Sequence, residues 1–146
     1  MRKVLCFISL CFLSSLSLSA LARNEVLNFS IEEALASSEF SELVGSDVTF
    51  YFGSRSYPEP KQTFGTFGSN KKTNSFNKSD QGACRRALYS ALISLRDRAL
   101  AEGGDAVIKI VSNYKGRQFS SEKEFQCGAG SFVSGVALRG QVVRLK

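Results

Sequence analysis

Apolar residues between positions 80 and 102 recur with the 3.6-residue period of an α-helix. The polar residues of this stretch fall elsewhere on the helical wheel, so one face is apolar throughout. Ser79 or Asp80 can cap the start, and Gly103 tolerates the left-handed conformation that ends a helix. The apolar stripe consists of Cys84, Ala87, Leu88, Ala91, Leu92, Leu95 and Ala99. We expect one long amphipathic helix that packs on the core.

The residues after this helix alternate between apolar and polar, which is the pattern of half-buried strands. Residues 106–111 predict a first strand, and residues 114–117, which contain a Lys-Gly pair, predict a hairpin tip. Three residues of the returning chain share the side that faces the helix: Phe119, Phe125 and Cys127. The core side of a last strand follows: Val136, Leu138, Gly140 and Val142. The pattern predicts a small antiparallel or mixed sheet beneath the long helix.

The two sides of the first strand differ in character. One side carries Ala106, Ile108 and Ile110, and the other carries Val107, Lys109 and Val111. Together with the back of the last strand, a second apolar face is expected from Val107, Val111, Ala137, Val143 and Leu145. Because large apolar patches are rarely left in water, we expect the helix of residues 31–44 or a second subunit to cover this face.

The start of the chain has the layout of a secretory signal. Arg2 and Lys3 form a charged beginning, residues 4–18 are apolar and serine-rich, and small residues occupy the positions that a signal peptidase reads. About 15 apolar residues are fewer than the roughly 20 that span a bilayer. The leader cysteines lie too early for a lipoprotein signal. We expect cleavage after residues 1–22, which leaves one domain without a transmembrane anchor.

Residues 23–52 predict a helical segment followed by a strand. Ser30 and Glu33 have the spacing of a capping box, and apolar residues follow on one side. This stripe drifts along the chain, so the helix is expected to be short, bent or frayed before Gly45 ends it. We expect residues 23–46 to form an N-terminal helical segment. Residues 47–52, rich in β-branched and aromatic side chains, predict a strand.

Residues 53–79 form the least regular part of the sequence, and we expect a long loop there. Aromatic and basic residues are interleaved in it, and six are candidate partner-binding residues: Phe64, Phe67, Lys71, Lys72, Phe76 and Lys78. In a cytosolic protein this mixture would indicate single-stranded nucleic acid, but export argues against nucleic acid. Two interpretations stay open: the phenylalanines fix the loop to the core while the lysines are solvated, or the loop binds a partner protein or an anionic envelope component.

Only Cys84 and Cys127 remain once the leader is removed. They are too far apart for a Cys-x-x-Cys redox pair, and an exported protein is in a compartment where disulfides persist. Cys84 lies on the apolar stripe of the helix, and Cys127 lies on the strand side that faces it. We therefore predict one structural disulfide between helix and sheet.

The sequence contains no histidine, which excludes Ser-His-Asp and Cys-His nucleophiles. Two cysteines without imidazole also leave too few ligands for a typical zinc site, so we expect no metal and no cofactor. Of 19 basic residues, Arg2 and Lys3 leave with the leader, so 17 remain against 13 acidic ones, a net charge of +4. An enzyme would have to use Asp105, Glu122 and Glu124 with Lys109, which the periodicity places at ordinary surface positions. We expect no enzyme.

Two stretches resemble a known family. The sequence G-G-D-A-V-I-K-I at residues 103–110 and the sequence G-A-G-S-F-V-S-G-V-A-L-R-G-Q-V-V-R-L at residues 128–145 are similar to the YbjQ-type domain. Its members place a long helix, a G-[AG]-[DN]-A-V strand and a final V-x-G-x-A-V strand in this order, and are described as heavy-metal-binding. With its leader and cysteine pair, the chain also resembles the globular domain of the Rcs envelope-stress sensor lipoprotein. The likeness covers about residues 47–145 and implies a fold more than an activity.

Similar exported proteobacterial sequences, which share N-K-S-D-x-x-A-C at residues 77–84 and an E-F-x-C-G-A-G turn, are sometimes labelled excinuclease ATPase subunit. This chain lacks the G-x-x-x-x-G-K-[ST] phosphate loop that an ATPase needs. The resemblance therefore implies no ATPase activity.

Together the patterns predict an exported α+β protein made of a signal peptide, the helical segment 23–46 and an α+β domain at residues 47–146. We interpret it as a periplasmic or secreted, non-enzymatic binding module with a stress-sensing or accessory role. It would act through residues 53–79 and the hairpin tip, on an envelope protein or an anionic envelope component. The alternative is a structural homo-oligomer joined through the second sheet face.

Overall fold

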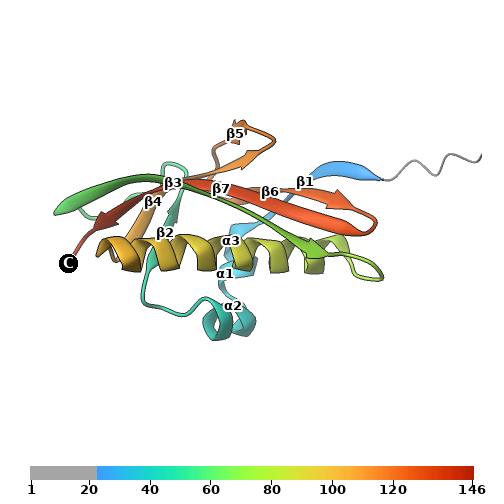
Figure 1. Cartoon of the computed structure of the whole chain (residues 1–146), viewed down its shortest axis with the longest axis horizontal. Helices are drawn as coiled ribbons and strands as arrows, with labels where there is room; N and C mark the ends of the chain where they lie inside the picture. The colour runs from blue at the N-terminus through green and yellow to red at the C-terminus, as the bar shows by residue number, and fades with distance from the viewer. Residues whose placement is uncertain (1–22) are drawn as a thin grey trace, which may run out of the picture.

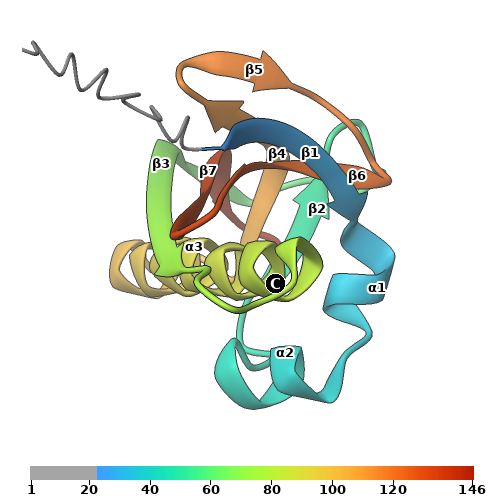
Figure 2. The same cartoon turned by 90° about the vertical axis from the view of Figure 1, so that its right-hand side faces the viewer.

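The computed structural model describes residues 23–146, and the predicted signal peptide lies outside them. One curved, mixed sheet of seven strands packs against the long helix α3, Asp80–Glu102 (Figure 1). Two short helices, α1 (Ile31–Leu35) and α2 (Ser38–Leu43), lie at the side of the molecule next to α3 (Figure 2). The predicted α+β class, with a sheet on one long helix and a short helix before it, is confirmed.

The long helix α3 begins and ends where the sequence predicts. The Ser79 hydroxyl accepts a hydrogen bond from the Gly82 N–H at 3.1 Å, which caps the first turn. Gly103 ends the helix in the left-handed conformation, with φ of 87°. At Gly104 a Cβ atom would lie 2.8 Å from a Val142 methyl group, so only glycine lets the helix end approach the sheet this closely. Every residue of the predicted apolar stripe is buried.

The central strand of the sheet is β7, Val133–Arg144. On one side it pairs with β3, Gln62–Asn74, and on the other with β4, Ala106–Tyr114, both antiparallel. Near its start it also pairs with β6, Glu124–Gly130. Three further strands complete the sheet: β2 (Thr49–Phe52) parallel to β4, β5 (Arg117–Phe119) antiparallel to β4, and β1 (Asn24–Ser30) antiparallel to β6. The strands predicted at residues 47–52, at 106–111 and at the end of the chain are confirmed.

Cys84 on α3 and Cys127 on β6 form the predicted disulfide, with their Cα atoms 5.8 Å apart. Both residues are fully buried in the main hydrophobic core. The bond joins helix and sheet across a sequence separation of 43 residues. It therefore closes a long loop in the unfolded chain. A disulfide stabilises the fold mainly by lowering the conformational entropy of that unfolded chain.

The first strand, β1, lies where we predicted only helix. It pairs with β6 from Asn24, opposite Gly130, to Ser30, opposite Glu124. Its alternating apolar residues Leu27 and Phe29 pack against the core, so a short strand signal was present. The helix prediction is correct for the next residues, where the Ser30 hydroxyl accepts a hydrogen bond from the Glu33 N–H at 3.2 Å. A second cap at Ser37 starts α2 as a separate helix.

The predicted loop at residues 53–79 is wrong for Gln62–Asn74, because these residues form β3. Thr and Phe in the first half of β3 favour a strand, but the second half, from Gly68 on, is mostly residues without strong β-propensity and has little local signal. Its ladder with β7 extends from Gln62 to Asn74, with one register shift near Gly65, whose φ is 122°. These residues therefore form a strand because they pair with β7, which is far away in the sequence.

A β-bulge in β4 changes which of its residues face the helix. The register with β7 shifts after Ile108, and Lys109 has a φ of 52° there. The main core consequently contains both Val107 and Ile110, while a smaller cluster on the opposite face contains Ala106, Ile108 and Val143. The predicted alternation of sides is wrong, because one extra residue reverses the direction of every side chain that follows.

The second apolar face is covered within a single chain. Tyr51 and Tyr57 pack against its cluster, with ring centroids 5.9 Å apart. Val143 is fully buried, Ala137 is nearly so, and Val111 and Leu145 are half-buried, whereas Val107 lies in the main core and not on this face. The short helices α1 and α2 contact α3 instead, so the predicted cover by the N-terminal helix is wrong. The homo-oligomer alternative assumed a large exposed apolar patch on this face, but only Val111 and Leu145 are partly exposed there.

The predicted hairpin tip is present between β4 and β5. Lys115 and Gly116 have φ of 52° and 73°, as the turn of a two-residue hairpin requires. Phe125 and Cys127 lie under the helix as predicted, but Phe119 is only half-buried and lies next to Tyr114. The reason is that β5 ends at Phe119 and the chain then crosses to pair with β1 rather than continuing the hairpin.

Candidate functional site

The side chains considered for an enzyme are not gathered into one site. Both carboxylate oxygens of Asp105 accept hydrogen bonds from backbone N–H groups at the C-terminus, at 2.7 and 3.0 Å. Glu122 accepts a hydrogen bond from a serine hydroxyl at 2.6 Å. Glu122 and Glu124 line one hollow, whereas Lys109 lines another. Within residues 23–146, no group of three or more His, Cys, Asp and Glu side chains could hold a metal ion.

The six candidate partner-binding residues fall into two groups along β3. Phe64 and Phe67 lie toward the start of the strand, half-buried against the main core. A guanidinium group covers each ring, with Arg144 5.5 Å from the centroid of Phe64 and Arg98 4.3 Å from that of Phe67. These two phenylalanines pack on the core, in agreement with the structural interpretation of the loop. At about 3.3 Å per residue, Phe64 is about 33 Å from the far end of the strand.

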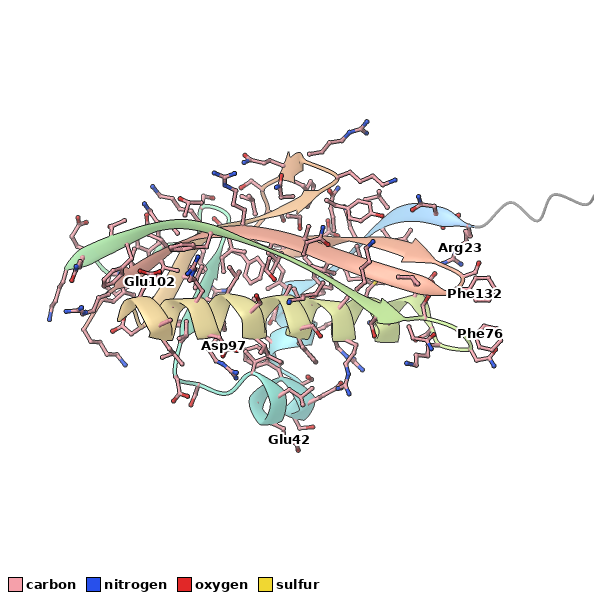
Figure 3. All side chains as sticks on the ribbon, viewed as in Figure 1. Arg23, Glu42, Phe76, Asp97, Glu102 and Phe132 are labelled. Carbon is pink, nitrogen blue, oxygen red and sulfur yellow. A yellow bond between two sulfur atoms is a disulfide. The ribbon has the colours of Figure 1, made fainter. Side chains whose placement is uncertain are left out.

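Phe76, at that far end, is exposed and stacks on a second exposed phenylalanine. Phe76 is 55% exposed and Phe132 is 62% exposed, with ring centroids 5.6 Å apart and planes only 7° from parallel. Val133, next in the chain, is 51% exposed. These three are half of the large hydrophobic residues that are exposed among residues 23–146. Figure 3 shows Phe76 and Phe132 at one end of the molecule, opposite Glu102.

Two connections hold this pair of rings. Phe76 lies between β3 and α3, and Phe132 lies in the turn between β6 and β7. Ser75 joins the two connections, because its N–H donates to the Phe132 carbonyl at 2.9 Å and its hydroxyl donates to the Gly130 carbonyl at 2.6 Å. The Asn74 side chain accepts a hydrogen bond from the Phe76 N–H at 2.8 Å. The rings are therefore placed by backbone and turn contacts, although they are exposed.

One lysine lies beside the two rings, and two more are close to them in the sequence. Lys72 lines the same shallow hollow as Phe76, Phe132 and Val133, and Lys71 and Lys78 are exposed nearby in the sequence. None of these lysines forms an ion pair with another described residue. We define the tip surface as Lys72, Phe76, Lys78, Phe132 and Val133. It combines exposed aromatic area with unpaired positive charge.

Sequence reasoning found Lys72, Phe76 and Lys78 but missed Phe132 and Val133. The available signal was an aromatic residue in the short S-F-V connection between two predicted strands, where polar turn residues are usual. The two phenylalanines are far apart in the sequence, so only the folded chain brings them together.

A second surface lies on the face of the sheet away from α3. A hollow of about 300 Å³ is lined by Thr66, Lys109, Val111, Gln118, Arg139, Gly140 and Gln141. Lys109 and Arg139 supply two positive charges there, and no carboxylate lines it. The hollow contains no exposed large hydrophobic residue. It offers polar contacts alone, whereas the tip surface also offers apolar area.

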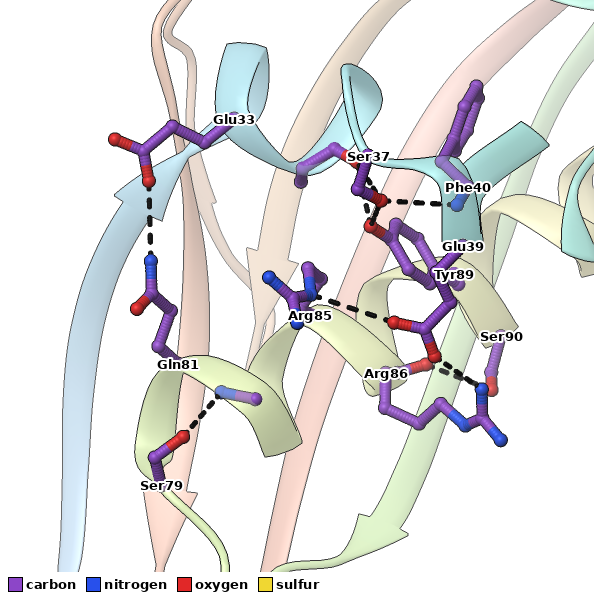
Figure 4. A network of polar contacts seen from close by, with 12 residues as sticks. Glu33, Ser37, Glu39, Phe40, Ser79, Gln81, Arg85, Arg86, Tyr89 and Ser90 are labelled. Atoms are coloured by element: carbon purple, nitrogen blue, oxygen red, sulfur yellow. Dashed lines mark hydrogen bonds and ion pairs between the residues drawn. The ribbon is translucent and has the colours of Figure 1, made fainter. Parts of the chain in front are cut away.

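The contacts of α1 and α2 with α3 are structural (Figure 4). The buried Tyr89 hydroxyl donates to the Ala34 carbonyl at 2.7 Å and is 2.5 Å from the Ser37 hydroxyl. Arg86 donates to Glu39 at 2.6 Å on the exposed side of the same contact. These bonds fix the short helices to α3 and leave no open cavity for a ligand at Tyr89, which is fully buried.

Comparisons with family models, with curated proteins and with solved structures found no match. Among the helices of residues 23–146, none is both long enough and apolar enough to cross a membrane.

Proposed function

We propose that this chain is an exported, non-enzymatic binding module of the bacterial envelope, periplasmic or secreted, with a stress-sensing or accessory role. It contacts its partner, an envelope protein or an anionic envelope component, through the tip surface. The resemblance to YbjQ-type and Rcs-sensor-like domains supports a role in the envelope.

Export is supported by two independent features. The first is the signal-like leader, and the second is the buried disulfide between Cys84 and Cys127. Structural disulfides persist in oxidising compartments and are rare in the cytosol. Pulse-labelling of cells should therefore give a processed chain that begins at Arg23 and reacts with no thiol reagent unless it is first reduced.

The observation that carries the binding function is the stacked pair Phe76 and Phe132, which is mostly exposed and shares a hollow with Lys72, a residue in no ion pair within the described chain. A folded protein gains little from holding two aromatic rings together in water, whereas exposed apolar clusters rimmed by polar residues mark interaction sites. Aromatic residues are also enriched at the centres of interfaces.

A photoreactive amino acid at position 132, followed by irradiation of intact cells and mass spectrometry, tests the proposal. The matched control places the same group at Leu100, which is 47% exposed near the opposite end of α3. We expect adducts from position 132 and not from position 100, and fewer adducts when Lys71 and Lys72 are replaced by alanine. Equal labelling at both positions would contradict a binding role for the tip surface.

The homo-oligomer through the second sheet face is the competing function. Light scattering on the exported protein decides between the two, because a stable assembly predicts a multiple of the chain mass. A monomer at micromolar concentration would contradict the structural role.

A further inference from the structure

We infer that the partner of the tip surface is the surface of an anionic phospholipid bilayer, with Phe76 and Phe132 among the lipid head groups. This inference rests on the proposed function and names the partner class of the same site. Three features of the described residues support it: the shape of the aromatic pair, the charge around it, and the direction from which the chain arrives.

The aromatic pair lies on turns that end the molecule rather than inside a deep pocket. Phe76 and Phe132 project from two neighbouring connections, and the hollow that they line is shallow. A helical or proline-rich peptide is usually held in a hydrophobic groove. Exposed aromatic side chains at a protruding end instead match the interfacial region of a bilayer, where aromatic rings are enriched.

The charge around the rings matches an anionic surface. Lys72 and Lys78 belong to the tip surface, and neither is in an ion pair within the described chain. The nearby carboxylates of Asp80 and Glu25 both pair with Arg23, so this one positive charge offsets one of the two negative charges, and the two lysines exceed the one that remains. Lysines close to anionic lipids are attracted by the surface potential within about a Debye length. A second copy of this chain would instead bring like charges together, which disfavours a dimer through this surface.

The chain enters the fold at the same end. Arg23 pairs with Asp80 at the start of α3, and Figure 3 shows Arg23 beside Phe132. The apolar leader run ends at residue 18, so residues 19–22 separate it from Arg23, and four residues reach at most about 14 Å. On the proposed function, a signal peptide in the membrane would leave the tip surface within this reach of the bilayer.

Co-sedimentation with vesicles tests the inference. The protein is produced from the full-length sequence, purified after export, and mixed with vesicles of phosphatidylglycerol and phosphatidylethanolamine or of phosphatidylcholine alone. We expect binding to the anionic vesicles that weakens as salt is raised, and little binding to phosphatidylcholine. Phe76→Ala or Phe132→Ala should each weaken binding by about tenfold. Lys72→Ala with Lys78→Ala should weaken it by roughly fivefold per lysine.

Two control variants match these changes elsewhere on the molecule. Leu100→Ala removes an exposed apolar residue from the opposite end, and Lys109→Ala with Arg139→Ala removes two positive charges from the other surface. Both should bind vesicles as the unchanged protein does. Because Phe76 and Phe132 are mostly exposed, their variants should keep the melting temperature of the parent, which shows that any lost binding is not lost folding.

Two results would overturn the inference: no sedimentation with anionic vesicles at millimolar lipid, or equal losses for the tip variants and the controls. Adducts to a protein from position 132 without vesicle binding would refute the bilayer as partner and leave the binding module standing. Absence of both adducts and vesicle binding would refute the proposed function as well.

Discussion

Replacing Cys84 and Cys127 together by alanine should lower the free energy of unfolding by about 4 kcal/mol. The magnitude follows from the sequence separation of 43 residues, because closing a loop of that length removes about 13 cal/mol/K from the entropy of the unfolded chain. Domains of this size are stable by about 5–15 kcal/mol. The loss is therefore a large fraction of the total.

Urea unfolding followed by circular dichroism measures this loss. With a slope of about 1–3 kcal/mol/M, the midpoint should fall by about 1.3–4 M. The single variant Cys84→Ala should match the double variant, because either change breaks the same bond. Reduction of the unchanged protein should give a similar midpoint, which controls for the volume lost with the buried sulfur atoms.

A loss below about 1 kcal/mol in all three comparisons would refute the reasoning. It would mean that the unfolded chain already keeps these two segments together, so that the bond adds no constraint. Two free thiols in the native exported protein would refute the bond itself, and with it the main structural support for an oxidising compartment.

Three further changes test the packing. Tyr89→Phe should destabilise the fold by about 0.5–1.5 kcal/mol in urea unfolding, since the Ala34 carbonyl loses its donor at 2.7 Å and keeps only the Ser37 hydroxyl at 3.2 Å; a loss near zero would show that the Ser37 hydroxyl satisfies this carbonyl alone. Gly128→Ala should lower the melting temperature, because a Cβ there would lie 2.1 Å from the ring of Tyr114 and force the ring to move. Tyr114→Ala in the same chain should restore part of this loss, and equal melting of the single and double variants would contradict the contact. Asp105→Ala should speed amide hydrogen exchange at the C-terminus, because its carboxylate accepts two backbone hydrogen bonds there. Unchanged exchange would show that these two bonds do not protect the end of the chain.

The long helix could be predicted to its ends because its determinants are local. The cap at Ser79 and the stop at Gly103 each act within one turn, and the apolar stripe repeats within four residues. The disulfide could be predicted by similar reasoning, since only two cysteines remain after the leader and both lie on apolar faces. Neither prediction needed to know which strands are neighbours.

Three features could not be predicted as the long helix and the disulfide were: the edge strand β3, the first strand β1 and the bulge at Lys109. The second half of β3 is poor in residues with strong β-propensity, and it is a strand because β7 supplies hydrogen-bond partners along its length. The bulge depends on the register between β4 and β7, which a pattern within β4 alone does not contain. Each of these features is a property of a pair of segments.

The sequence by itself determined the α+β class, the long helix, the disulfide and three of the five tip-surface residues, because helix periodicity, caps, cysteine number and residue type are properties of the chain alone. Only the tertiary structure separated Phe64 and Phe67, which pack on the core, from Phe76, which does not. It also brought Phe132 against Phe76. The physical reason is that burial and stacking depend on distances in space between segments far apart in sequence, and a strand ladder fixes those distances only when the chain has folded.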